Sequence, residues 1–266
     1  MKLSIEHTTT YRYDKPISYA LQKLRLTPKS RVGHEVINWE TIITGGTKQA
    51  VYDDHHANLV ELVSFEPGRT EFTIQSKGVV ETTDNHGITG QNKGFVPLWL
   101  FQRSTDLTKA GNGVKHLLKG FSIDPDDQIG SLHALSKLVL EKVTYQGGAT
   151  EVNSSAEEVI KAGAGVCQDH AHVFIAAARH LGHPARYVSG YLMMNEVVIQ
   201  DATHAWVEAY VEGVGWVGFD VSNGISPDER YVRVATGLDY SEAAPISGLM
   251  RGGSEEELLV SLQVQQ

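Results

Sequence analysis

Residues 163–182 read Gly-Ala-Gly-Val-Cys-Gln-Asp-His-Ala-His-Val-Phe-Ile-Ala-Ala-Ala-Arg-His-Leu-Gly, and they decide how the second half of the chain folds. From 171 to 181 the apolar side chains recur at helical spacing. Gly182, with Pro184 two residues later, is a usual way for a helix to end. The glycines at 163 and 165 interrupt any preceding helix. The pattern therefore predicts a new helix that begins at or near Cys167.

A cysteine in the first turn of a helix is chemically favoured as a nucleophile. The free backbone amides and the partial positive charge of the helix start favour a thiolate and can stabilise an oxyanion. Two other interpretations stay open at this point. Cys167 can be a small buried hydrophobe. A metal site with His170 and His172 is less favoured, because His172 does not share a helix face with the other two and no further ligand pair follows.

The candidate base lies on a predicted hairpin. Residues 203–211 alternate cleanly, so His204 and Trp206 share one face, and residues 216–220 run back to Asp220. A two-residue loop would place Asp220 on the face away from His204. A three-residue loop, or a bulge, would place Asp220 opposite Trp206 and diagonal to His204, and Gly215 can supply the positive φ that such a loop needs.

The first 95 residues alternate as β-strands, and turn residues separate the segments. They predict a mainly antiparallel, sandwich-like β domain over residues 1–95. A polar, glycine-containing stretch at 84–95 marks the expected boundary. The expected strands are 4–13, 21–27, 37–43, 58–65 and 70–80.

Residues 96–266 predict a second domain with helices first and strands after them, an α+β order. Asp124 is the expected cap of a helix over 124–143, with Pro125 in its first position. A capping box is expected at 154–158, from one of the two serines and one of the two glutamates. The remaining expected elements are helices at 104–118 and 155–162 and strands at 186–192, 231–235 and 258–264.

Bulk composition excludes several classes of function. The 266 residues carry a net charge of -9 and show no basic stripe, so nucleic acid is not an expected partner. No apolar run is long enough to span a membrane, and the first residues lack a signal peptide's apolar stretch. With its single cysteine, the chain is expected in the cytoplasm. No cofactor or metal is expected, and the oligomeric state stays open.

Together these segments resemble the transglutaminase-like superfamily of papain-like thiol enzymes, and in particular bacterial members with an N-terminal β domain that are often described as candidate cysteine proteases. Two departures from the family pattern are visible. His170 stands where an aromatic residue is common, and Val221-Ser222 replaces the more usual Pro-Thr. They put substrate preference in doubt. The resemblance rests on residues 165–169, 185–191, 204–208, 215–220 and 223–224, with 7–13, 24–28 and the tail 232–253.

The resemblance implies a papain-like, transglutaminase-like core and a catalytic triad of Cys167, His204 and Asp220. It implies a thiol hydrolase that cleaves peptide or amide bonds through a thioester, with a peptide or protein as substrate. Two alternatives remain: a transglutaminase, in which an amine takes the acyl group, and a non-catalytic peptide-binding protein of the same fold. The Cys167 amide is an expected oxyanion donor, and its companion cannot be named from the sequence.

Overall fold

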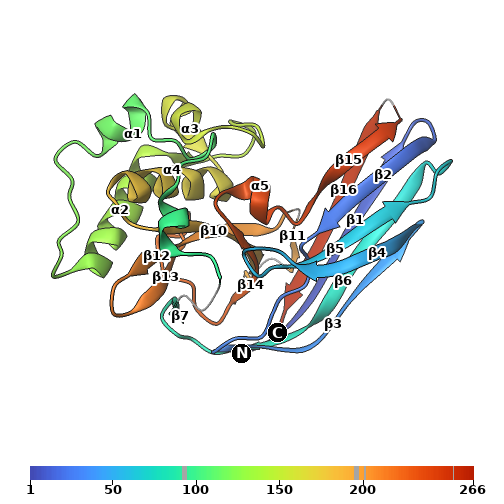
Figure 1. The fold of residues 1–266 in the computed structure, drawn as a ribbon, viewed down its shortest axis with the longest axis horizontal. Helices are drawn as coiled ribbons and strands as arrows, with labels where there is room; N and C mark the ends of the chain where they lie inside the picture. The colour runs from blue at the N-terminus through green and yellow to red at the C-terminus, as the bar shows by residue number, and fades with distance from the viewer. Residues whose placement is uncertain (92–94, 195–197, 201, 254) are drawn as a thin grey trace.

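The computed structural model describes residues 1–91, 95–194, 198–200, 202–253 and 255–266. A long β-sandwich lies beside a second unit in which helices cover a smaller sheet (Figure 1). This is the α+β class expected from the sequence, with mixed helices and antiparallel sheets. None of the helices in these ranges is long and apolar enough to cross a membrane.

The sandwich consists of two antiparallel sheets. Burial alternates along strands such as Lys2–Tyr13 and Glu71–Thr82, so one face of each lies in the core and the other is more exposed, as a half-buried pleat requires. Phe65 and Phe72 stack between the sheets with ring centroids 3.7 Å apart. One sheet has the order β11 (Ile199–Gln200), β16 (Glu256–Gln265), β1 (Lys2–Tyr13), β6 (Glu71–Thr82) and β3 (His34–Thr44), and the other β15 (Ile246–Gly252), β2 (Ile17–Leu24), β5 (Leu59–Phe65) and β4 (Gly46–Asp53).

The sandwich is completed from the C-terminus, so its strands are not confined to the residues 1–95 expected for the β domain. β16 pairs with β1 from Ser4↔Gln265 to Tyr13↔Glu256, and β15 pairs with β2. In the other direction, β7 (Ile88–Gly90) joins the sheet of the second unit. Strand alternation shows which face of a strand is buried but not which strand it pairs with, so these exchanges could not be predicted.

The second unit has an antiparallel sheet of order β14 (Tyr231–Gly237), β10 (Ala185–Leu192), β12 (His204–Val211), β13 (Gly215–Phe219) and β7. Helices pack on one face of this sheet around a core that includes Val139, Phe174 and Val207. The helical elements are η1 (Leu98–Gln102), α1 (Asn112–Leu117), α2 (Gln128–Lys142), α3 (Ala156–Ala162), α4 (Cys167–His180) and α5 (Tyr240–Ala243), and the short parallel pair β8 (Thr144–Tyr145) and β9 (Ala164–Gly165) leads into α4.

The two units share a core. Val232 and Val234 of the smaller sheet pack with Leu3, Leu262 and Val264 of the sandwich, and all five are buried. The strands of the smaller sheet are mostly buried on both faces. Helices cover one side, and on the other the sandwich packs against β14 while Phe101 of η1 packs on Trp216 of β13 (Figure 1). Polar groups that are buried on these strands need partners inside the protein, because burial without a hydrogen bond is costly.

The helix starts agree with the sequence at α3 and differ at α2. Ser155 and Glu158 form a reciprocal capping box at the start of α3. α2 begins at Gln128, where Asp127 accepts from the amide of Gly130 at 2.9 Å. The expected cap Asp124 instead closes a turn by accepting from the Asp126 amide at 2.9 Å. Within the helix expected over 104–118, the structure forms only α1, so the helix begins at Asn112 and ends at Leu117.

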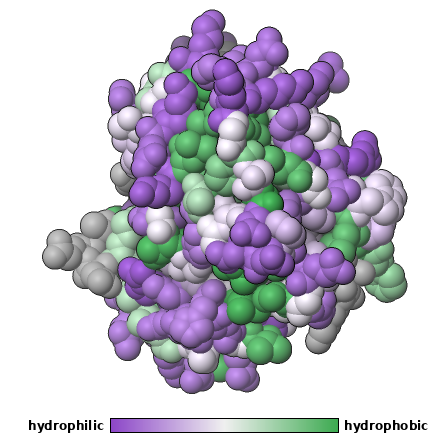
Figure 2. Space-filling model, turned by 90° about the vertical axis from the view of Figure 1, so that its left-hand side faces the viewer, coloured by the Kyte–Doolittle hydropathy of each residue, from purple (hydrophilic) through white to green (hydrophobic). Residues whose placement is uncertain are grey.

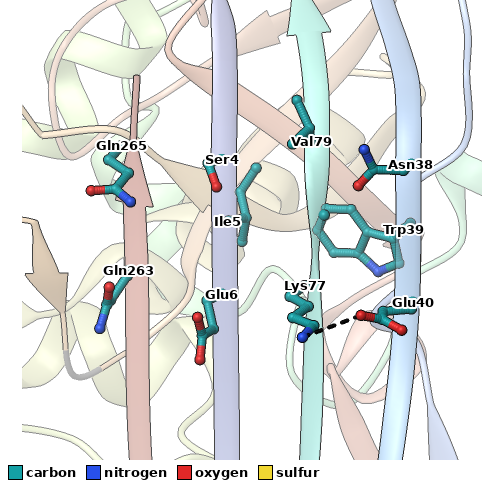
Figure 3. Close-up of a pocket in the computed structure, with 11 residues that line it drawn as sticks. Ser4, Ile5, Glu6, Asn38, Trp39, Glu40, Lys77, Val79, Gln263 and Gln265 are labelled. Carbon is teal, nitrogen blue, oxygen red and sulfur yellow. Dashed lines mark ion pairs between the residues drawn. The ribbon is translucent and has the colours of Figure 1, made fainter.

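The outer faces differ in character. On the sandwich, a hollow of about 490 Å³ crosses β16, β1, β6 and β3, and polar ends such as Glu6, Lys77 and Gln263 line it (Figure 3). Lys77 pairs there with Glu40 at 3.2 Å. The opposite end of the molecule, on the helical side, is mostly hydrophilic with smaller groups of apolar side chains (Figure 2). Cys167, the first residue of α4, lines a different hollow, together with residues of β12.

Candidate active site

The sequence around Cys167 builds the start of α4 locally. Cys167 is the first residue of the helix, and Val166 before it is extended. The carboxylate of Asp169 accepts from the Val166 amide at 2.8 Å and from the Thr150 hydroxyl at 2.6 Å. A Cβ on Gly165 would lie 2.6 Å from that carboxylate, so only glycine fits there. These contacts hold the cysteine at a helix start, as predicted, with its side chain partly accessible.

The hairpin has the register that the chemistry required. Val207 pairs with Phe219 and Val211 pairs with Gly215, which leaves a loop of three residues, 212–214. Gly215 has a φ of +106°, a conformation that favours glycine. The prediction of a three-residue loop is confirmed. His204 and Asp220 meet as a result, with 2.6 Å between His204 Nε2 and Asp220 Oδ2.

Asp220 is buried and held by several donors. Tyr231 donates its hydroxyl to Oδ2 at 2.7 Å, and the side-chain amide of Asn223 donates to the same oxygen at 2.7 Å. Burial alone would favour the neutral acid, but the hydrogen bonds and the charge of His204 outweigh it and lower the pKa of Asp220. Sequence reasoning missed Tyr231 as a partner, because a tyrosine on a predicted strand carries no signal of which side chain it will meet.

His204 lies between Asp220 and Cys167. Burial opposes its charged form, but hydrogen bonds to Asp220 and Cys167, and the charges of both, raise the pKa of His204 to about 10. Since Nε2 is taken by Asp220, Nδ1 is the nitrogen left for the sulfur. The structure thus brings the three predicted residues into one chain of contacts, sulfur to imidazole to carboxylate. This is the arrangement that nucleophilic catalysis uses.

Two hollows adjoin this chain of contacts. One, of about 530 Å³, is lined by Cys167, His204 and Tyr187. The other, of about 590 Å³, is lined by His204, Asn223 and Tyr231. Tyr145 borders both. The pKa of the Tyr145 hydroxyl is raised by burial and by the charges of Cys167 and Asp220, so this side chain also lies close to the reacting groups.

The two departures from the family pattern are partners of each other. His170 Nε2 faces the Val143 carbonyl oxygen at 2.8 Å, so this nitrogen donates, and Nδ1 accepts from the Ser222 hydroxyl at 2.8 Å. Burial lowers the pKa of His170, which keeps the ring neutral. The ring is buried and lines neither hollow, so the expected link between His170 and substrate preference is not supported.

The metal interpretation of the cysteine helix also fails. Both ring nitrogens of His170 are hydrogen-bonded, to Val143 and Ser222, and His172 Nε2 accepts from the Tyr240 amide at 3.2 Å. Over the part of the chain that the structure describes, the one group of three metal-type ligands close together is His55, His56 and Glu242, which contains none of them.

Two segments of the chain match known protein families. Residues 115–221 match the transglutaminase-like superfamily, and residues 3–81 match the bacterial transglutaminase-like N-terminal region. The chain belongs to the transglutaminase-like superfamily. The first match contains Cys167, His204 and Asp220, and the second contains most of the strands that the N-terminus gives to the sandwich.

Relatives of this transglutaminase-like protein cover its whole length. An uncharacterized protein from Mycobacterium leprae is 28% identical and aligns with 99% of this chain and 98% of its own. An uncharacterized protein from Mycobacterium tuberculosis is 27% identical over 98% of this chain and 91% of its own. The crystal structure of a candidate cysteine protease from Cytophaga hutchinsonii has the same fold, with a TM-score of 0.74 and 23% identity over 100% of this chain and 98% of that one.

Proposed function

We propose that this protein is a thiol-dependent hydrolase that cleaves peptide or amide bonds, with Cys167 as nucleophile, His204 as general base and acid, and Asp220 as the residue that positions His204. The supporting observation is the buried histidine held between the cysteine and a carboxylate, 2.6 Å from the latter. The cytoplasm, which keeps a lone thiol reduced, is the proposed compartment.

The steps follow from this arrangement. The raised pKa of His204, about 10, favours an imidazolium beside a thiolate in the resting enzyme. The Cys167 sulfur attacks the carbonyl carbon of the substrate and forms a tetrahedral oxyanion. When the C–N bond breaks, His204 gives its proton to the departing amine, and a thioester remains on Cys167. Neutral His204 then takes a proton from water, whose oxygen attacks the thioester and releases the acid and the thiolate.

The oxyanion needs at least two donors in most enzymes of this type. Cys167 is the first residue of α4. Its backbone amide has no acceptor within the helix, since the first amides of a helix are unpaired. Tyr145 is the second donor in this proposal, because its side chain borders both hollows beside Cys167 and His204. The side-chain amide of Gln168 is not available, as it donates to the Val152 carbonyl at 2.7 Å.

The hollow beside Asn223 and Tyr231 gives an amine acceptor a place to approach, so transamidation is the second candidate. Water and an amine would attack the same thioester, and the product distinguishes them. A binding protein of the same fold would form no thioester at all.

Single-turnover acylation with an activated ester tests the proposal. Because Cys167 is the one cysteine of the chain, any thiol adduct in the mass spectrum is on this residue. The wild type should release one equivalent of leaving group and gain one acyl group, and Cys167→Ala should do neither. Acid as the product, with or without added amine, identifies a hydrolase, and amide formed in the presence of amine identifies a transamidase. A wild type that gains no acyl group would contradict enzymatic function.

A further inference from the structure

A second polar site lies about midway along β12, between the smaller sheet and the sandwich. Glu208 is fully buried and accepts hydrogen bonds from Arg186 and Arg233. The Arg186 Nε lies 2.6 Å from Glu208 Oε2, and Arg233 Nε lies 2.7 Å from Oε1. Arg186 lies on β10, which is next to β12 in the sheet, and Arg233 lies on β14, which is on the far side of β10. Their guanidinium groups saturate the carboxylate, so Glu208 has no capacity to neutralise a further cation.

A third arginine from the sandwich unit nevertheless faces this group. Arg31 lies in the connection between β2 and β3, and its Nε is buried without a hydrogen-bond partner among the described residues. Burial lowers the pKa of the Arg31 guanidinium, and the charges of Arg233 and Arg186 lower it further, against the opposing charge of Glu208. Three cations thus surround one carboxylate, and among the described residues that line the neighbouring cavity there is no second carboxylate to balance them. Buried charges are normally paired.

The guanidinium groups of these arginines border a cavity of about 330 Å³. Arg31, Arg186 and Arg233 line it together with the hydroxyl-bearing Ser30 and Thr89, and no carboxylate is among its lining residues. Arg186 lies over the Trp216 ring, 3.9 Å from its centroid, which fixes the plane of the guanidinium. The Nε and Nη2 atoms of Arg186 and Arg233 are bound to Glu208, so the N–H groups left for a ligand are those on Nη1 and those of Arg31, with the Ser30 hydroxyl beside them. Guanidinium N–H groups of this kind bind phosphate and carboxylate groups in proteins.

We propose that this cavity binds a small oxyanion with two or more negative charges, such as inorganic phosphate or a tricarboxylate, with Arg31 as the residue that closes the site from the sandwich side. The anion supplies the counterions that the three arginines lack. It lies where the two units meet, so its binding joins the connection before β3 to the sheet that carries His204.

A cation is the wrong ligand for this region. His55, His56 and Glu242 lie at its edge, and their ligand atoms come within 4.8 Å of one another. Glu242 is already used, since Oε2 accepts from the Leu238 amide at 2.8 Å and lies 2.7 Å from His56 Nε2. His55 and His56 line the same cavity as the three arginines, and the surplus positive charge there repels a metal ion.

Calorimetry and thermal unfolding of the full-length chain test the proposal without reference to catalysis. Inorganic phosphate and citrate are titrated separately at neutral pH, with sodium chloride at matched ionic strength as the reference. Phosphate or citrate should bind with one site and raise the unfolding temperature, and chloride should not. The more effective of the two shows whether phosphate or carboxylate groups are preferred.

The variant Arg31→Gln removes one donor and leaves the bonds from Arg186 and Arg233 to Glu208 in place. Binding should weaken about tenfold or more, as expected for loss of a charge-assisted hydrogen bond. In the absence of anion, the same variant should unfold at the same or a higher temperature, because an unpaired buried charge is gone. The matched control Arg12→Gln, on the exposed surface of β1, should bind as the wild type does.

Two results would overturn the site. One is a wild type that responds to phosphate and citrate no more than to chloride. The other is an Arg31→Gln protein that keeps the full response, which would place the anion elsewhere. If Arg31→Gln unfolds at a lower temperature and the wild type binds no anion, the three arginines serve only to join the two units.

Discussion

Asp220 and Glu208 are two buried carboxylates on the same hairpin, and their partners differ in one respect. Asp220, at the end next to the cysteine, faces an imidazole, a phenol and an amide. Glu208, farther along β12, faces two guanidinium groups. Arginine stays charged at every pH of interest, whereas histidine gains and loses a proton near neutrality. The partner, and not the depth of burial, therefore decides whether a buried carboxylate serves proton transfer or a fixed ion pair.

The largest effect is expected where the partner can transfer protons. His204→Ala should slow single-turnover acylation by about 10²- to 10⁴-fold, the usual contribution of general acid–base catalysis. Neither thiol activation nor protonation of the leaving amine has a replacement beside Cys167. Stopped-flow release of the leaving group measures the rate. A variant as fast as the wild type would remove the proposed distinction between the two ends of the hairpin.

Glu208→Gln should act on stability instead. It leaves Arg186 and Arg233 buried without a counterion, and breaking a buried pair in this way costs about 3–5 kcal/mol. Urea unfolding measures the loss, and the rate of acylation per folded molecule should stay close to that of the wild type. Glu71→Gln, which breaks the exposed pair with Arg12, is the matched control and should change stability little. An equally small loss for Glu208→Gln would mean that water reaches the arginines.

Asp220→Asn tests the carboxylate that faces the histidine. The variant keeps the shape of the side chain and an oxygen acceptor but loses the charge that stabilises the imidazolium. The acylation rate should fall by less than in His204→Ala, by about 10- to 100-fold if general acid–base catalysis is only partly impaired. Stability should fall by less than in Glu208→Gln, because no arginine loses its counterion. A larger rate loss than that of His204→Ala would reverse the roles given to the two residues.

The smallest effect is a difference in pH dependence. Charged His204 stabilises the fold fully below its ordinary pKa of 6.5, and this stability is lost as the pH rises toward its folded pKa of about 10. Ionised Glu208 stabilises the fold fully above its ordinary pKa of 4.5, and its contribution is lost as the pH falls toward 2, since the arginines lower its pKa to about 2 despite burial. Urea unfolding from pH 3 to 10 should show the cost of His204→Gln shrinking at alkaline pH and that of Glu208→Gln at acid pH. The same pH dependence for both variants would contradict these assignments.

Local features of this site were predictable because their causes lie close together in the chain. The helix start at Cys167 depends on Gly165 and Asp169, each two residues away from it, and the hairpin loop depends on Gly215. The register followed from one chemical requirement, that Asp220 reach His204. The cap of α2 lies three residues later than predicted, at Asp127 in place of Asp124, because both aspartates are suitable caps and the local sequence does not choose between them.

The helix that begins at Cys167, the hairpin that carries His204, and the order of Cys167, His204 and Asp220 were all predictable from the sequence. Only the tertiary structure decided that Tyr231 and Asn223 hold Asp220, that His170 and Ser222 bond to each other, and that Arg31 meets Arg186 and Arg233. It alone decided that β15 and β16 complete the sandwich. The physical reason is range: capping and alternation act over a few residues and leave a pattern, whereas a pairing such as Ser4 with Gln265 joins segments that carry no mark of each other until the core forms.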